Sequence, residues 1–323
     1  MITRRQAWFA TLWLLVLAVA LVSWVFVRKG NPFVRPREQW SIGIVEGRSP
    51  FDFDVTTRPE PVFTAGDVTG MSARFVADPF LVRETGTWYL FFEVYNNATH
   101  QGDLAVATST DTRSWAYQGV IIDEPFHLSY PYVFRWQDDW YLIPESYEAK
   151  AVRLYRATHF PDKWQFVRTL IDHTELVDNS IVRFNDKWWL FSCSTDSRNL
   201  QLFFADDLAG PWVRHPLSPI VADDPHKARS SGRALVYDGH LYRYTMDVDP
   251  PTGTHRVFAY EITTISPTEY AEQPARSGPV LSPQGVGWAG AGMHQIDPVQ
   301  IGPERWIASV DGFGRYPLIP WAH

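Results

Sequence analysis

The sequence has very little cysteine: Cys193 is the only one among 323 residues. A single cysteine cannot form an intramolecular disulfide, and it excludes a zinc site built from several cysteines. Cys193 lies within the apolar run WWLFSCS, so we expect a buried structural thiol rather than a nucleophile. The sequence also lacks a stripe of basic residues interleaved with aromatics, and its net charge is −7. We therefore expect no nucleic-acid partner.

Long helical patterns are absent after the first 30 residues, whereas aromatic residues are abundant: 15 Trp, 14 Tyr and 20 Phe. Aromatic residues favour strands, and their rings can also stack on sugar rings. Most of them should fill the core of an all-β domain, and a minority remain as candidates for ligand contacts.

A two-strand unit recurs about every 50 residues. An apolar strand is followed by a short polar turn such as Asn185-Asp186 or Asp238-Gly239, and a second strand then opens with large apolar residues. The second strands begin at Trp88-Tyr89, Trp140-Tyr141, Trp188-Trp189, Leu241-Tyr242 and Trp306-Ile307. A β-sandwich would not repeat such a pair at this period. The pattern predicts an all-β, five-bladed β-propeller, and we expect a first strand near Trp40–Val45 to close the ring against the last blade.

The N-terminus predicts a single transmembrane helix in front of the propeller. Ala7–Val27 contains no charge and, at about 1.5 Å per residue, would span the roughly 30 Å of a bilayer core. A cleaved signal peptide is the alternative, but its apolar region is normally shorter. We expect an anchor over residues 1–30, a tether over 31–39 and the propeller over 40–323. The predicted location is a single-pass membrane protein, and basic residues on both sides of the span leave the side of the propeller open.

Acidic residues fall at one end of the predicted hairpins. Residues equidistant from a turn lie opposite each other in an antiparallel pair, and this arithmetic places several side chains near one mouth of the ring. The predicted pairs are Asp78 with Glu93, Asp178 with Cys193, Asp297 with Asp311, Glu145 with Pro131-Tyr132, and Ser231 with Met246; His294 lies just before Asp297.

Any one of these carboxylates could simply end a strand. A converging set is harder to explain in that way, because clustered carboxylates repel one another unless a ligand, metal or partner uses them. Paired carboxyls are what glycoside hydrolysis needs, one to activate water and one to protonate the leaving oxygen. Calcium in the central channel is the competing use, with an ion near His294, although no local calcium loop is visible.

Five stretches carry a family resemblance: SIGIVEGRSPFDF, FVADPFLVRETGTWYLFFEVYN, DEPFHLSYPYVFRW, YLIPESYEA and GMHQIDPVQ. Together, from about Trp40 to Gly314, they resemble the N-terminal domain of glucosamine inositolphosphorylceramide transferases. In those proteins a separate glycosyltransferase domain follows. We expect that domain to be absent from this chain, so the resemblance implies no transferase activity here, and a separate glycosyltransferase partner becomes an expectation.

More distantly, the chain is similar to glycoside hydrolase family 43. That resemblance implies a general base at Asp78, an acid-tuning carboxylate at Asp178, and a histidine near the channel axis at His294. The family's general acid is a Glu, and this chain has Ser231 where we expect it. The resemblance therefore leaves Glu145, and second Glu93, as the candidate acid; the alternative for Glu145 is a bracing ion pair with Arg153. The candidate substrate contacts are Glu93, Tyr130, Tyr132, Arg233, His294, Asp297 and Asp311.

Two functional hypotheses follow. The first is a glycosidase-like hydrolase that acts on a glycan or glycolipid with Asp78 as base and a substitute acid. The second is a glycan-recognition module that keeps the site but lacks the chemistry. A purely structural scaffold is disfavoured by the number of carboxylates at one mouth. Neither hypothesis names the sugar or the linkage.

Overall fold

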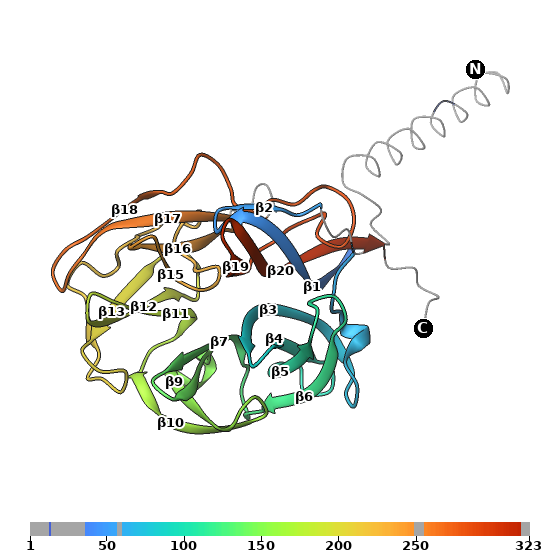
Figure 1. Ribbon diagram of the computed structural model, residues 1–323, viewed down its shortest axis with the longest axis horizontal. Helices are drawn as coiled ribbons and strands as arrows, with labels where there is room; N and C mark the ends of the chain where they lie inside the picture. The colour runs from blue at the N-terminus through green and yellow to red at the C-terminus, as the bar shows by residue number, and fades with distance from the viewer. Residues whose placement is uncertain (1–12, 14–35, 57–59, 249–254, 318–323) are drawn as a thin grey trace, which may run out of the picture. The chain divides into compact units, whose positions relative to one another are not determined.

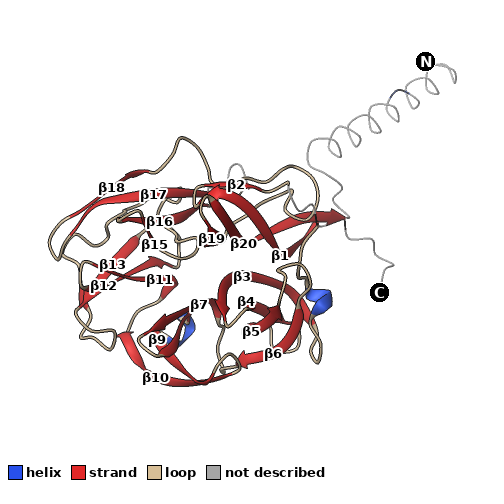
Figure 2. Ribbon diagram, in the orientation of Figure 1, coloured by secondary structure: helices blue, strands red, loops and turns tan. Residues whose placement is uncertain are grey.

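A computed structural model describes residues 13, 36–56, 60–248 and 255–317 of the chain. Its compact unit Gln39–Gly314 is an all-β ring of five four-stranded sheets. Figure 1 shows the sheets arranged radially as blades, and Figure 2 shows that strands and loops form nearly all of this unit. The prediction of a five-bladed β-propeller is confirmed.

The first two blades are consecutive in the sequence. The first consists of β3 (Ala73–Glu84), β4 (Thr87–Asn96), β5 (Gln101–Ser109) and β6 (Ala116–Ile122). The second consists of β7 (Ser129–Trp136), β8 (Asp139–Glu145), β9 (Ala151–His159) and β10 (Lys163–Asp172). The described residues also form two 3₁₀ turns outside the sheets, η1 (Ala65–Asp67) and η2 (Tyr147–Ala149).

The next two blades follow the same plan. The third consists of β11 (Leu176–Phe184), β12 (Lys187–Ser194), β13 (Leu200–Ala205) and β14 (Val213–Arg214). The fourth consists of β15 (Leu235–Tyr237), β16 (His240–Asp247), β17 (Arg256–Ile265) and β18 (Tyr270–Pro274).

The last blade joins the two ends of the propeller. Its strand order is β19–β20–β1–β2, so the two N-terminal strands complete a sheet begun by the two C-terminal ones. The predicted closure by the segment near Trp40–Val45 is therefore confirmed. The four strands are β19 (Ile296–Gly302), β20 (Arg305–Pro317), β1 (Pro36–Ser49) and β2 (Asp52–Asp54).

Local sequence explains the inner hairpins. Three of the turns between the first and second strands of a blade have two successive residues at positive φ: Thr85-Gly86, Asn185-Asp186 and Asp238-Gly239. Positive φ at both central residues defines the type I′ turn, whose twist matches that of the paired strands. The second strands begin one residue before the predicted aromatic pairs, at Thr87, Asp139, Lys187, His240 and Arg305.

The hydrophobic core lies between neighbouring blades. One cluster joins the first three blades through residues such as Phe91, Ile143 and Leu190. Others join the third blade to the fourth, the fourth to the last, and the last to the first. In the last of these, Ile42 and Ile44 of β1 are at most 1% exposed. Each fully buried side chain of this size contributes about 1.5–3 kcal/mol, so packing as well as strand pairing closes the ring.

The prediction of a transmembrane helix is corrected. No helix in the part of the chain that the structure describes is long and apolar enough to cross a membrane. The predicted span Ala7–Val27 lies outside the described residues except for Trp13. The fold class that the described residues support is accordingly an all-β propeller, and the membrane location that rested on the N-terminal segment stays a prediction.

Candidate functional site

The innermost strands of the first three blades share a bulge at the ring centre. The strand register shifts between Ala77 and Phe80, between Ser129 and Tyr132, and between Val177 and Ser180. The residue within each bulge, Asp78, Tyr130 or Asp178, has a φ of 52°, 47° or 51°. A non-glycine residue in this region costs on the order of 1–3 kcal/mol and persists only where its surroundings hold it. The bulges therefore give Asp78 and Asp178 equivalent positions in their blades.

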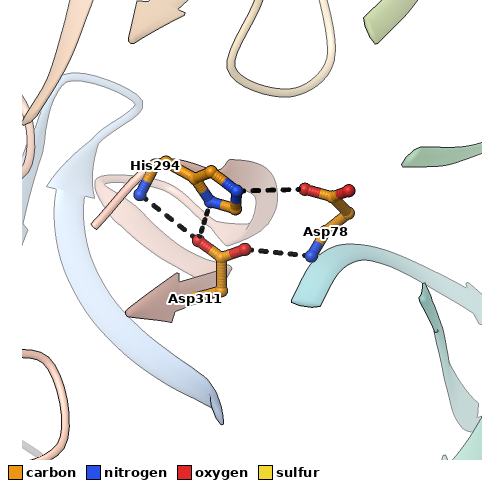
Figure 3. A group of neighbouring side chains, drawn as sticks. All are labelled: Asp78, His294 and Asp311. Carbon is orange, nitrogen blue, oxygen red and sulfur yellow. Dashed lines mark hydrogen bonds and ion pairs between the residues drawn. The ribbon is translucent and has the colours of Figure 1, made fainter. Parts of the chain in front are cut away.

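Asp78 meets the last blade in a three-residue cluster (Figure 3). The Asp311 carboxylate accepts the backbone N–H of Asp78 at 2.9 Å and bonds His294 Nδ1 at 2.7 Å. His294 Nε2 lies 3.5 Å from Asp78 Oδ1. Asp311 also accepts the backbone N–H groups of His294 and Gln295. A fully buried carboxylate thus fixes both the histidine ring and the backbone that carries Asp78.

Opposing electrostatic effects set the protonation of this cluster. Burial, partly offset by the His294 charge, raises the pKa of Asp78 to about 7. Burial alone would lower the pKa of His294, but the charge and hydrogen bond of Asp311 outweigh it, so the pKa of His294 is raised. Asp78 is therefore poised to gain or lose a proton near neutral pH beside a histidine that favours its charged form.

Asp178 and Glu145 form a second cluster around Arg229. The Arg229 guanidinium donates to Asp178 Oδ2 at 2.5 Å and to Ser197 Oγ at 3.2 Å. Glu145 Oε2 accepts the backbone N–H of Asp178 at 3.3 Å. Burial, followed by the charge of Asp178, raises the pKa of Glu145 well above its ordinary value. Glu145 therefore holds its proton under conditions in which an exposed glutamate would be ionised.

Glu93 lies in the same group of buried carboxyls. Glu93 is only 5% exposed. Burial is the main effect that raises the pKa of Glu93 well above the ordinary value, and the charge of Asp78 is the next largest. The structure thus brings together Asp78, Glu93, Glu145, Asp178, His294 and Asp311.

Four other predicted contacts lie within the packing of the ring. Arg233 donates two hydrogen bonds to the fully buried Asp297 carboxylate, at 2.8 and 3.2 Å. The hydroxyl of Tyr130 donates to the Gly232 carbonyl at 2.8 Å and accepts its N–H at 2.6 Å. The Tyr132 hydroxyl donates to the Ile181 carbonyl. These groups have protein partners through which they brace neighbouring blades, and their role as substrate contacts stays a prediction.

Ser231 likewise has a structural role. It is fully buried, and its hydroxyl donates to the backbone carbonyl of His294. The position at which the glycoside hydrolase resemblance implies an acid thus holds a group that supports the His294 loop.

The register differs from the hairpin arithmetic at several predicted pairs. Glu93 and Cys193 pair with Ala77 and Val177, one residue before the predicted aspartates, because the bulges begin there. In the other blades the pairs are Asp297 with Ser309, Glu145 with Ser129, and Ser230 with Thr245. The proposed brace of Glu145 by Arg153 is also not formed, since Arg153 lies 3.6 Å from Glu124.

Sequence reasoning missed three residues at this site. Arg229 was hidden in an irregular segment before β15, and only the folded ring brings it to Asp178. Trp40 packs over His294 with ring centroids 4.1 Å apart, and His255 stacks parallel to His294 at 6.1 Å. Trp40 was visible as an aromatic residue in the closing strand, whereas no local pattern indicates His255.

Asp78, His294 and Asp311 offer ligand atoms within 4.8 Å of one another. This set fits calcium poorly. Calcium takes six to eight oxygen ligands, whereas here one donor is an imidazole nitrogen and both oxygens of Asp311 already accept hydrogen bonds. No chemical step is assigned to calcium.

The five-bladed propeller fold of this chain is also found in solved structures of glycoside hydrolases. The catalytic domain of a family 62 α-L-arabinofuranosidase from Coprinopsis cinerea superimposes with a TM-score of 0.54 at 15% identity, covering 85% of this chain and 97% of that one. An exo-β-1,3-galactanase from Clostridium thermocellum gives 0.53 at 14% identity, covering 66% and 51%. At these identities the likeness concerns the fold.

The family itself is identified from sequence. Residues 36–313 match the family described as "Glucosamine inositolphosphorylceramide transferase 1, N-terminal", and the chain belongs to this family. The transferase of that name from Oryza sativa subsp. japonica is 35% identical over 297 residues, which cover 84% of this chain and 40% of the relative. The predicted family resemblance is confirmed. The chain spans about 40% of the length of the curated relatives that it matches.

Proposed function

We propose that the ring centre is a carbohydrate site of the glycoside hydrolase type, in which Asp78 acts as general base and Glu145 as general acid on a glycan or glycolipid. The observation that carries this proposal is how the surroundings of Asp78 and Glu145 shift the pKa values of the two carboxyls. The pKa of Asp78 is raised to about 7, whereas the pKa of Glu145 is raised well above its ordinary value. Acid–base cleavage of a glycosidic bond needs one carboxyl that can ionise near the working pH and another that keeps its proton.

Asp178 has the tuning role in this proposal. Its charge helps to keep Glu145 protonated, and its contact with Arg229 at 2.5 Å fixes its position. Two residues near the last blade fix Asp78: Asp311 accepts its backbone N–H, and His294 lies 3.5 Å from its carboxylate. The base would take a proton from water while Glu145 protonates the departing oxygen, so no covalent intermediate is required.

The substrate class follows from the relatives' name. They are called glucosamine inositolphosphorylceramide transferases, and we infer that this chain acts on, or binds, a sugar- or inositol-bearing head group. A separate glycosyltransferase partner stays a prediction.

A glycan-recognition module is the second candidate, favoured by Ser231. Its buried hydroxyl is engaged with the His294 carbonyl, so the usual acid position supplies no proton donor. In this case Asp78 and Glu145 would be ligand contacts only.

A combined glycan-array and hydrolysis screen separates the two candidates. We expect Asp78→Asn and Glu145→Gln to lose turnover by at least about 100-fold while binding of the cleaved glycan changes little. The amide of each variant keeps an acceptor for the backbone N–H that the carboxylate now accepts. Asp139→Asn, at an exposed ion pair of the second blade, is the control. Wild-type binding without turnover of any bound glycan would instead establish the recognition module.

A further inference from the structure

Glu93 has a buried oxygen that the protein leaves without a hydrogen-bond partner. Its Oε1 atom has none, although the residue is only 5% exposed. An unsatisfied buried carboxyl oxygen costs about 1–3 kcal/mol or more, so such groups in native proteins call for an explanation. The nearest ion-pairing group is the imidazole of His127, whose Nε2 lies 3.8 Å away. That separation is too long for a direct hydrogen bond.

The orientation of His127 is fixed by its other nitrogen. The backbone N–H of Gly102 donates to His127 Nδ1 at 2.9 Å, and the backbone N–H of His127 donates to Glu148 at 2.8 Å. Because Nδ1 accepts, the proton of the neutral ring must be on Nε2 and can be donated toward Glu93. Burial lowers the pKa of His127, which favours this neutral form.

Gly102 makes this arrangement possible. A Cβ at this position would lie 2.4 Å from the Leu128 carbonyl oxygen and 2.5 Å from Glu93 Oε1. Only glycine therefore lets β5 pass close enough to hold the His127 ring against Glu93. The donor and the acceptor are set by three chain segments: β4, β5 and the connection to β7.

We infer that Glu93 and His127 form a subsite for one uncharged hydroxyl of a sugar or cyclitol bound beside Asp78. This deepens the proposed carbohydrate function and rests on it. A gap of 3.8 Å lets one hydroxyl oxygen lie about 2.8 Å from both atoms, accepting from His127 Nε2 and donating to Glu93 Oε1.

The same chemistry sets the specificity. Burial raises the pKa of Glu93 and lowers that of His127, so both partners favour their neutral forms. A neutral donor–acceptor pair matches a hydroxyl and offers no counter-charge to an ammonium or phosphate group. The His127 side chain is 22% exposed, so it is the partly open member of this pair, and Glu93 is the buried one.

Two substitutions of His127 separate the donor role from the structural one. His127→Asn keeps an acceptor near the position of Nδ1 for Gly102 but removes the donor directed at Glu93. His127→Gln keeps a donor near the position of Nε2. His159→Phe, on the outer part of the second blade, is the control because that ring is 74% exposed.

Saturation-transfer NMR on the full chain would compare methyl β-D-glucopyranoside with the set of its monodeoxy derivatives. We expect one derivative to bind the wild type and the His159→Phe control about tenfold more weakly than the parent, the effect of one lost hydrogen bond. In His127→Asn that difference disappears, and His127→Gln restores part of it. Equal binding of all derivatives to the wild type, a difference that survives in His127→Asn, or no binding of the parent would overturn the inference.

A ligand-free crystal structure gives a second test. We expect an ordered water within hydrogen-bond distance of both Glu93 Oε1 and His127 Nε2, because water takes the place of the sugar hydroxyl. Direct closure of the two atoms to hydrogen-bond distance, with no water between them, would overturn the subsite. Both tests measure binding alone. Their outcome would therefore be the same if the protein showed no turnover and the hydrolase proposal failed.

Discussion

Asp311 shows how a single residue can organise a site without facing solvent. Its fully buried carboxylate accepts hydrogen bonds from the His294 ring and from the backbone of Asp78, His294 and Gln295. The hydrogen bonds fix geometry, and the charge holds the pKa of His294 above the ordinary histidine value against the effect of burial. Asp311 is therefore a positioning residue, whereas Asp78 is the group proposed to meet water.

Asp311→Asn tests this division of roles. The substitution removes the charge that stabilises protonated His294, so burial should dominate and the pKa of His294 should fall by at least about one unit. An NMR titration of the His294 ring measures this directly, with Asp139→Asn as the control. A His294 pKa that stays unchanged in Asp311→Asn would show that Asp311 does not set the charge of the cluster.

At the scale of elements, the ring centre depends on irregular backbone. Three inner strands bulge at equivalent places, and in the fourth blade Gly232, next to Ser231, has a φ of +112°. Gly232 forms a parallel bridge to Ile296 of the last blade, and its backbone exchanges two hydrogen bonds with the Tyr130 hydroxyl of the second. Because Ser180 of the third blade also donates to the Gly232 carbonyl, this one glycine links four blades across the centre.

Gly232→Ala should be far more damaging than an ordinary turn substitution. A Cβ would lie 1.7 Å from the Ile296 carbonyl oxygen, so the bridge between blades must open. We expect a loss of more than about 3 kcal/mol in the free energy of unfolding, measured by denaturant titration. Gly239 also has a positive φ, but a Cβ there would meet open space. Gly239→Ala should therefore lower the free energy of unfolding by only about 1 kcal/mol. Equal effects of the two substitutions would contradict this role for Gly232.

At the scale of the whole molecule, the repeat was readable because it is local. Turn residues and the aromatic residues beside them mark each inner hairpin, so the blade count and the starts of the second strands follow from sequence. The bulges were not readable, and they moved the pairing of Glu93 from Asp78 to Ala77. Contacts such as Arg229 with Asp178 join residues 51 positions apart and exist only once the ring closes. The sequence thus predicted which acidic residues and which histidine gather at the ring centre. It did not predict which groups they pair with.

The pH dependence of kcat/KM for a glycan that the full chain cleaves tests the central claim most directly. A base must be ionised to work, so we expect kcat/KM to rise with pH as Asp78 loses its proton around pH 7. It should fall again where Glu145 loses the proton that burial and the charge of Asp178 help it to hold. In Glu145→Gln the falling limb should vanish together with most of the activity. Turnover that is greatest below about pH 5, or binding of every tested glycan without turnover, would contradict the account.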